Sequence, residues 1–221
     1  MKFLNFKNEV SPSHYLPILI ISFFPMTVFI GSGIINTQII LLDLFFLYEL
    51  SKQKKIDYLD NKYFFILLLI WFIFLINLFF SINFNNSFLR SFGFIRFLIL
   101  IFAIKYFIFD INKNYQKYIF SVWIFSFILI SIDLIYEFIF GKNILGFKSY
   151  IPGRLSGLFV NELKIGYLYS FFSLIVLSAI YLRFYKSKKN IYLFYIIFLS
   201  VLILSFLIGE RANFIKTFIM F

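Results

Sequence analysis

Long apolar runs separated by short polar segments dominate the pattern of this chain. Seven runs can be read as membrane-spanning helices, at residues 15–30, 34–50, 63–80, 88–109, 118–140, 163–182 and 191–208. A spanning helix needs about 20 predominantly apolar residues. A further apolar run begins after Arg211 and reaches Phe221. The pattern therefore predicts an all-α fold, a polytopic integral membrane helical bundle of about seven complete transmembrane helices plus the start of an eighth.

The domain organisation follows from the absence of any linker in the sequence. No Pro/Gly/Ser-rich stretch and no internal repeat divides the chain, so we expect one transmembrane domain over residues 1–221, with an outer loop at residues 141–163. The final apolar run rises only about 15 Å as a helix, against roughly 30 Å of hydrocarbon. A half-spanning end would leave carbonyl groups unpaired in lipid. We therefore expect a truncated, N-terminal part of a longer protein.

Composition narrows the possible chemistry. The chain is 62% hydrophobic and 24% aromatic, more than a soluble domain of 221 residues requires. It has no cysteine, and its single histidine is His14, which excludes thiolate metal sites, a histidine-built metal site and a Ser-His-Asp triad within this chain. The net charge of +11 comes from residues between the apolar runs, which is typical of membrane topology rather than of nucleic-acid binding. We expect no metal, no cofactor and no nucleic-acid partner.

The distribution of lysine predicts the orientation. Lysines fill the loops between the second and third, fourth and fifth, and sixth and seventh runs, while residues 81–87 carry no charge. The positive-inside rule makes the lysine-rich side cytoplasmic. The N-terminus, with Lys2 and Lys7, falls on that same side.

Arginine is distributed differently from lysine. Four of the five arginines, Arg90, Arg96, Arg154 and Arg211, fall at or near the predicted outer face. Positive-inside sorting does not distinguish the two residue types, so it does not explain this difference. The planar guanidinium group matches phosphate and carboxylate in a bidentate manner. The pattern indicates a site for an anionic, lipid-linked substrate at the outer mouth of the bundle.

Two polar segments are the strongest candidates for that site. Arg154 follows Pro152-Gly153 and is separated by one residue from Ser156-Gly157, a composition typical of a turn. Such a turn lets backbone amides and a guanidinium group converge on an anion. Asn161 and Glu162 then lead to a helix N-terminus, which also favours anions. Glu210 and Arg211 begin the incomplete span. The alternatives are a solvated loop charge for Arg154, and a helix cap and a snorkelling side chain for the second pair.

Charges within the apolar runs are weaker candidates. Arg90 can snorkel to the interface, whereas Arg96 lies deeper and needs a polar partner or a cavity. Asp133 and Glu137 are spaced i, i+4 and share one helix face. They either neutralise Arg90 or Arg96 across a helix contact, which we favour, or form an acid–base or cation site. Asp43 is a solitary carboxylate.

Three segments together resemble a known family. They read GRLSGLFVNELKIGYL at residues 153–168, LSFLIGERANF at 204–214 and LRSFGFIRF at 89–97. At these segments the chain resembles the O-antigen ligase and O-antigen polymerase family of bacterial inner-membrane proteins. The family pattern has an arginine segment with an Asn or acidic residue before a span, and a later span that closes on a glycine and an arginine.

The resemblance implies a glycosyl transfer on the periplasmic face of the bacterial inner (cytoplasmic) membrane. The donor would be a glycan on undecaprenyl diphosphate, and the acceptor lipid A-core, another glycan or a protein. No metal or nucleotide cofactor is implied. Catalytic roles, by stabilising the departing diphosphate, would fall to Arg154 and Arg211. Substrate-binding roles would fall to Arg90, Arg96, Asn161, Glu162 and Glu210.

One feature departs from the family, and three alternatives remain. The family's large periplasmic loop carries the histidine assigned to acceptor activation, and it would lie beyond Phe221. Without that histidine, Glu162 or Glu210 would have to serve as the base. We therefore expect this chain alone to be inactive or to be one piece of a split enzyme. The alternatives are a surface-polysaccharide polymerase, a transporter or flippase of lipid-linked or anionic solutes, and a non-enzymatic assembly partner. A transporter should show paired repeats or broken helices, which the sequence lacks.

Overall fold

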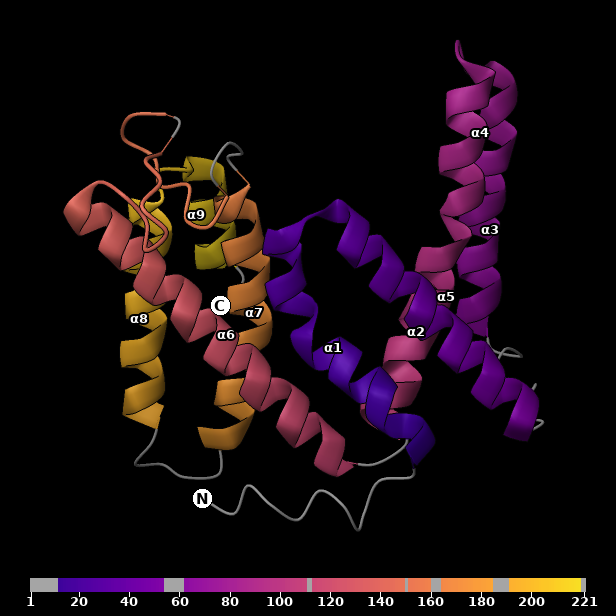
Figure 1. Ribbon diagram of the computed structural model, residues 1–221, viewed down its shortest axis with the longest axis horizontal. Helices are drawn as coiled ribbons and strands as arrows, with labels where there is room; N and C mark the ends of the chain where they lie inside the picture. The colour runs from indigo at the N-terminus through magenta and orange to yellow at the C-terminus, as the bar shows by residue number, and fades with distance from the viewer. Residues whose placement is uncertain are drawn as a thin grey trace. The chain divides into compact units, whose positions relative to one another are not determined.

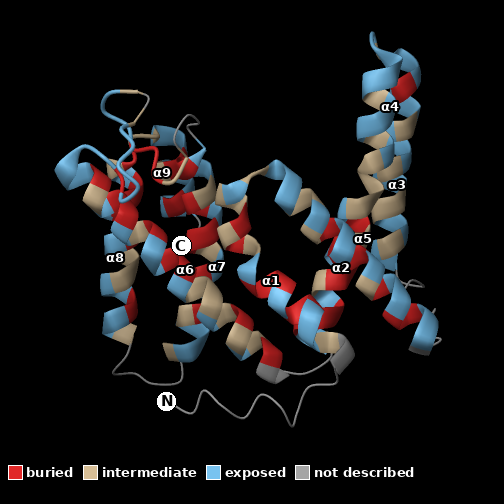
Figure 2. Ribbon diagram, viewed as in Figure 1, coloured by how far each residue is buried: buried red, intermediate tan, exposed pale blue. Residues whose placement is uncertain are grey.

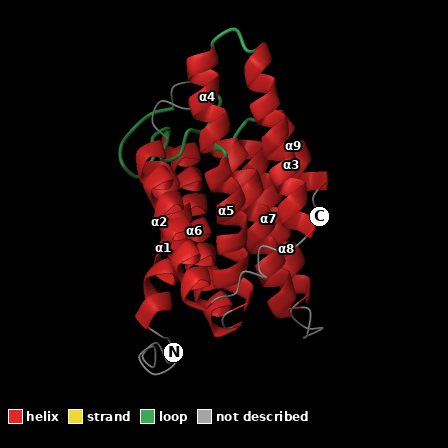
Figure 3. Ribbon diagram, turned by 90° about the vertical axis from the view of Figure 1, so that its right-hand side faces the viewer, coloured by secondary structure: helices red, strands yellow, loops and turns green. Residues whose placement is uncertain are grey.

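The computed structural model describes residues 12–53, 62–110, 113–149, 151–159, 164–184 and 191–219, and every regular element in these ranges is a helix (Figures 1 and 3). This confirms the predicted all-α class. In chain order the elements are α1 (Pro12–Ile30), α2 (Ser32–Gln53), α3 (Lys62–Asn77), η3 (Leu78–Phe80), α4 (Phe84–Gly93), α5 (Ile95–Lys105), η4 (Tyr106–Asp110), α6 (Lys113–Phe140), α7 (Ile165–Phe184), α8 (Ile191–Leu207) and α9 (Arg211–Ile219).

Five helical segments are long and apolar enough to cross a membrane: Ser32–Lys52, Lys62–Phe80, Phe84–Asp110, Tyr115–Phe140 and Ile165–Phe184. The predicted first and seventh spans are also helical, but their apolar parts, His14–Ile30 and Ile191–Leu207, are shorter. Each of these rises about 25 Å, less than the ~30 Å of a typical hydrocarbon core. The apolar helices indicate a membrane protein, whereas the predicted number of seven spans is not confirmed.

The chain divides into two compact units, Met1–Ile119 and Phe120–Phe221, and the boundary falls within α6. In unit 1, α2 packs against α1 and α5, and buried side chains such as Leu42, Phe46, Ala103 and Phe107 fill the contact. None of the residues of α3 is buried, as Figure 2 shows, although this helix is very apolar. An apolar surface of this extent is typical of a helix that faces lipid.

Unit 2 contains most of α6 together with α7, α8 and α9. Helix α7 packs against both α8 and α9. Helix α6 meets α7 through aromatic side chains, with the Phe127 and Tyr169 rings stacked at a centroid distance of 4.9 Å and Phe127 edge-on to Phe172 at 5.4 Å. The loop after α6 lies beside the turn between α8 and α9 (Figure 1). This places two polar segments that are far apart in the sequence at one end of unit 2.

Candidate anion-binding site

The first wall of the site is the loop that follows α6. The helix ends at Gly141, whose N–H donates to the carbonyl of Glu137 at 2.8 Å with φ +69, a left-handed residue of the kind that terminates many helices. Asn143 then closes a turn. Its side-chain oxygen accepts from the N–H of Phe147 at 2.8 Å, and its own N–H donates to the Phe147 carbonyl at 2.8 Å. These local bonds give the loop a defined path without regular secondary structure.

Glu137 holds the arginine-bearing part of this loop in place. Its buried carboxylate accepts hydrogen bonds from the N–H of Gly157 at 2.7 Å and from both the N–H and the hydroxyl of Ser156 at 3.1 Å. These three hydrogen bonds tie Ser156 and Gly157 of the loop to α6. The sequence pattern favours an ion pair of this residue with Arg90 or Arg96, whereas within unit 2 its bonds go to the loop that carries Arg154.

Two further buried side chains brace the same loop. The amide nitrogen of the Asn143 side chain donates to the carbonyl of Gly157 at 2.7 Å. An Asp133 oxygen accepts from the N–H of Ile144 at 2.9 Å. Asp133 and Glu137, one turn apart on α6, therefore bind two different points of one loop. This explains why an i, i+4 pair of carboxylates is present in an otherwise apolar helix.

The second wall is the turn between α8 and α9. The N–H of Leu155 donates to the carbonyl of Ile208 at 3.2 Å, which joins the two walls through their backbones. Gly209 has φ +84, and a Cβ at this position would lie 2.8 Å from the Gly153 carbonyl oxygen and 3.2 Å from Cγ of Arg154. Only glycine allows this close approach without strain. Gly209 therefore allows the loop that carries Arg154 to lie directly against the turn that precedes Arg211.

A cleft of about 790 Å³ lies between these walls, and its lining is formed by Pro152, Gly153, Arg154, Gly209, Glu210, Arg211 and Ala212. Arg154 and Arg211 are both exposed, and neither guanidinium group has a hydrogen bond or an ion pair within the described part of the chain. The first residues of α9 line the same cleft, so the positive end of the helix dipole lies there as well. Two guanidinium groups and one carboxylate give the lining a net positive charge.

Glu210 is held in place by side chains of α9. It accepts a hydrogen bond from the side-chain amide of Asn213, which in turn accepts from Lys216 at 3.4 Å. Gly166, near the start of α7, lies directly against this pair, since a Cβ there would be 2.7 Å from the Glu210 side-chain carbon and 3.1 Å from the Asn213 nitrogen. The start of α7 therefore lies close against the start of α9.

The other predicted site residues lie elsewhere. Arg90 is exposed in the last turn of α4, and Arg96 is half-buried in the first turn of α5, both in unit 1. The helix is interrupted between them at Phe94. The Arg96 guanidinium lies 4.9 Å from the Phe97 ring centroid and interacts electrostatically with Asp43. Asn161 and Glu162 lie outside the described residues.

The sequence pattern does not reveal the residues that shape the cleft. Asn143 is absent from the predicted site, although an asparagine soon after the glycine that ends a helix is a common turn signal. Gly209 enters the prediction only as part of a motif, and its role depends on a contact with residues more than fifty positions earlier. Gly166 has no local signal at all.

Comparison with protein-family models, with curated proteins and with solved structures gives no match to this chain. The chemistry of the site therefore rests on its geometry. An exposed, positively charged cleft with two guanidinium groups and a helix N-terminus is suited to a phosphate or diphosphate group. Among the described residues, no cluster of three or more His, Asp or Glu side chains is positioned to hold a metal ion.

Proposed function

We propose that the cleft binds the diphosphate of a lipid-linked glycan, and that the protein takes part in glycan transfer from an undecaprenyl-diphosphate donor to lipid A-core or another acceptor on the periplasmic face. The observation that carries this proposal is the convergence of Arg154 and Arg211 on one cleft. Two of the three segments that resemble the O-antigen ligase family, residues 153–168 and 204–214, contribute the two walls of that cleft. An apolar bundle beneath an anion site is the arrangement that a lipid-linked phosphate requires.

The reaction needs stabilisation of a leaving group. A hydroxyl of the acceptor attacks the anomeric carbon of the donor sugar, the bond from that carbon to the diphosphate breaks, and the diphosphate leaves with the electron pair. Negative charge therefore develops on the diphosphate in the transition state. Arg154 and Arg211 supply fixed positive charge at that point, which is the type of stabilisation that contributes most in many enzymes. The proton of the attacking hydroxyl passes to a base, and Glu210, the one carboxylate among the described residues of the cleft lining, would accept it.

A polymerase uses the same donor chemistry with another glycan as acceptor, so it remains the closest alternative. A transporter of lipid-linked or anionic solutes needs the same anion site but no bond cleavage. The distinction is therefore whether the donor's glycan is transferred.

The test is expression of the complete gene that contains this sequence, in a ligase-deficient Gram-negative strain that makes its own lipid-linked glycan. Polymer on lipid A-core is measured for the wild type and for Arg154→Lys and Arg211→Lys, at matched abundance in the membrane. The lysine variants keep the charge and remove the bidentate fork, so we expect at least a tenfold loss of transfer for each. Lys142→Gln, an exposed position outside the cleft lining, is the control.

The outcomes separate the alternatives. Polymer on lipid A-core that is lost in both lysine variants supports ligation through the guanidinium groups. Polymer that persists in both variants contradicts the proposed role of the arginines. Longer glycan chains that stay on the undecaprenyl carrier indicate a polymerase, and donor that changes leaflet with an unaltered glycan indicates a transporter.

A further inference from the structure

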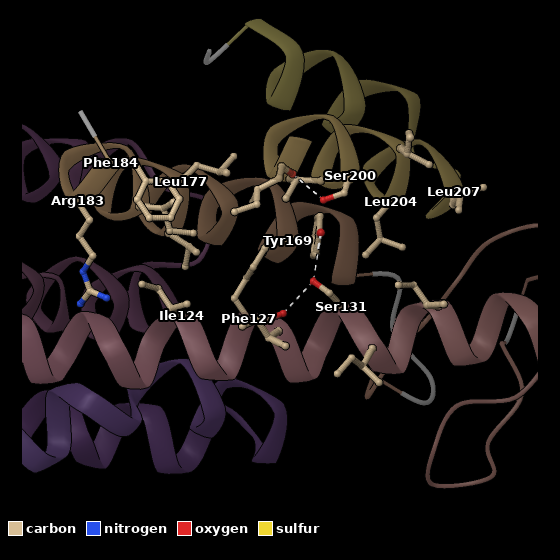
Figure 4. Close-up of a pocket in the computed structure, with 18 residues that line it drawn as sticks. Ile124, Phe127, Ser131, Tyr169, Leu177, Arg183, Phe184, Ser200, Leu204 and Leu207 are labelled. Carbon is tan, nitrogen blue, oxygen red and sulfur yellow. Dashed lines mark hydrogen bonds between the residues drawn. The ribbon is translucent and has the colours of Figure 1, made fainter. Parts of the chain in front are cut away.

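A second cavity of unit 2 lies between α6, α7 and α8 and shares no lining residue with the anion-binding cleft (Figure 4). Its volume is about 640 Å³, and its walls are almost entirely apolar. Small-molecule pockets typically occupy about 300–1,000 Å³, whereas packing voids in a protein interior rarely exceed a water molecule. The cavity therefore has the size of a binding site.

The cavity is long enough to hold the hydrocarbon of one leaflet, since on α7 its lining residues extend from Tyr169 to Phe184, about 22 Å along the helix axis. On α6 its lining residues extend from Ile124 to Ile135, which is about 16 Å along the helix axis. One leaflet contributes about half of the ~30 Å hydrocarbon core. A single acyl chain from one leaflet fits this length.

The hydroxyl groups inside the cavity are already bonded to the protein. Ser131 donates to the Phe127 carbonyl at 2.9 Å and lies 3.3 Å from the Tyr169 hydroxyl oxygen, while Ser200 donates to the Ile197 carbonyl at 2.7 Å. Figure 4 shows these hydroxyls among apolar side chains. Several lining residues, such as Ser200 and Ile203, are exposed, so the cavity is an open groove, and its apolar lining offers a water molecule few polar partners. A hydrocarbon chain is the occupant that such a lining favours.

One end of the cavity carries a positive charge. Arg183, in the last turn of α7, lies at one end and Leu207 lies at the other (Figure 4). Arg183 is exposed, and it donates to the Ser121 hydroxyl on α6 at 3.2 Å, which directs the guanidinium group across the mouth of the cavity. An arginine at the end of an apolar groove is complementary to a lipid with an anionic headgroup.

We propose that this cavity, the lipid pocket, holds one acyl chain of an anionic phospholipid whose phosphate contacts Arg183. Gly166, which touches Glu210 at the anion-binding cleft, is 17 residues from Arg183 along α7, or about 26 Å. That separation approaches the full thickness of the hydrocarbon core. The phospholipid therefore belongs to the leaflet opposite the cleft, and the lipid pocket is independent of the proposed glycan transfer.

The test is native mass spectrometry of the whole chain, purified in a neutral detergent and exposed to equimolar phosphatidylglycerol and phosphatidylcholine. Arg183→Gln removes the headgroup contact, and Ser200→Phe fills the pocket with a side chain. The matched controls are Lys142→Gln, which makes the same change of charge on the loop after α6, and Ser178→Phe, an exposed position on α7 outside the pocket lining. Size-exclusion profiles and circular dichroism verify that each variant is folded.

The wild type is expected to retain about one phosphatidylglycerol in preference to phosphatidylcholine. Arg183→Gln should lower that occupancy about fivefold, since a basic residue near the membrane surface contributes about that factor. Ser200→Phe should remove both lipids, and the two controls should behave as the wild type. Equal retention of both lipids, or retention that survives Ser200→Phe, would overturn the proposal. Lipid-free protein whose oligomeric state changes in Ser200→Phe would also overturn it, because the pocket would then be a protein–protein contact.

Discussion

The two units both bury a carboxylate in an apolar bundle, but they give it different partners. In unit 2, Glu137 accepts three hydrogen bonds from Ser156 and Gly157. In unit 1, one oxygen of the buried Asp43 has no hydrogen-bond partner among the described residues, and the group interacts electrostatically with Arg96. Glu137 thus holds a loop by hydrogen bonds, whereas Asp43 interacts with an arginine through its charge.

This difference determines which arginines remain accessible to a ligand. Glu137 accepts its hydrogen bonds from Ser156 and Gly157 and forms no ion pair with Arg154 in the described part of the chain, and Arg154 is exposed at the cleft. Arg96 is half-buried, lies over Phe97 and acts on Asp43. A charged group buried in an apolar setting is costly unless it has a partner, so unit 1 uses its arginine to stabilise the fold. In unit 2, the two arginines that line the cleft are exposed.

The largest effect is expected from Glu137→Gln. The variant replaces one acceptor oxygen by an NH₂ group that faces the N–H donors of the loop, and it removes the charge that strengthens the remaining bond. We expect the free energy of unfolding to fall by about 3 kcal/mol, and the loop at residues 141–159 to become sensitive to protease. Thermal unfolding in detergent and limited proteolysis measure the two effects.

Asp133→Asn is the matched control for Glu137→Gln. Its side-chain oxygen can still accept the one bond from Ile144, so its effect should be clearly smaller. Equal effects of the two substitutions would contradict the assignment of Glu137 as the main support of the loop.

The next effect is expected from Gly209→Ala. The positive φ of Gly209 strains any other residue, and the added methyl group would collide with the Gly153 carbonyl oxygen. We expect a loss of about 1–3 kcal/mol in the free energy of unfolding and a weaker affinity for phosphate, because the two walls of the cleft separate. Calorimetric titration with inorganic phosphate reports on the affinity.

Gly93→Ala is the control, since Gly93 lies in α4 with open space around the position of a Cβ and no positive φ. It should leave the affinity unchanged and stabilise the helix slightly. Unchanged phosphate affinity in Gly209→Ala would mean that the cleft does not depend on this close approach.

The smallest effect concerns the coupling of Asp43 and Arg96 in unit 1. Asp43→Asn and Arg96→Gln should each destabilise the protein, and the double variant should lose about 1 kcal/mol less than the sum of the two. Arg90→Gln combined with Asp43→Asn is the control, because Arg90 is exposed, and its effects should add. Additive effects in both cycles would show that Arg96 does not depend on the carboxylate.

Much of the fold could be predicted from the apolar pattern. Each long apolar run became a helix, because a run of that length in lipid has to satisfy its backbone hydrogen bonds internally. The number of spans does not follow as directly, since Pro12–Ile30 and Ile191–Leu207 are at the lower limit of length. The two arginine segments adjoin each other in unit 2, whereas their position at the outer face of the membrane stays a prediction from the loop charges.

The supports of the site could not be predicted in the same way. The i, i+4 spacing of Asp133 and Glu137 shows that the two side chains share a face but not which groups they bind. Their partners are backbone N–H groups 11 to 20 residues later, and backbone donors leave no mark on the sequence. From the sequence alone, a buried carboxylate in a membrane helix predicts an ion pair. Only the structure of the following loop shows that its partners are backbone N–H groups.

The central claim is that Arg154 and Arg211 act together on one phosphate-bearing ligand. Isothermal titration of the purified chain with inorganic pyrophosphate, at low salt, tests it most directly. Each bond from a guanidinium group to phosphate contributes about 1.5–3 kcal/mol, so Arg154→Gln and Arg211→Gln should each lower the affinity about tenfold or more, while Lys142→Gln should bind as the wild type. Pyrophosphate binding that is the same in both arginine variants as in the wild type would contradict the account.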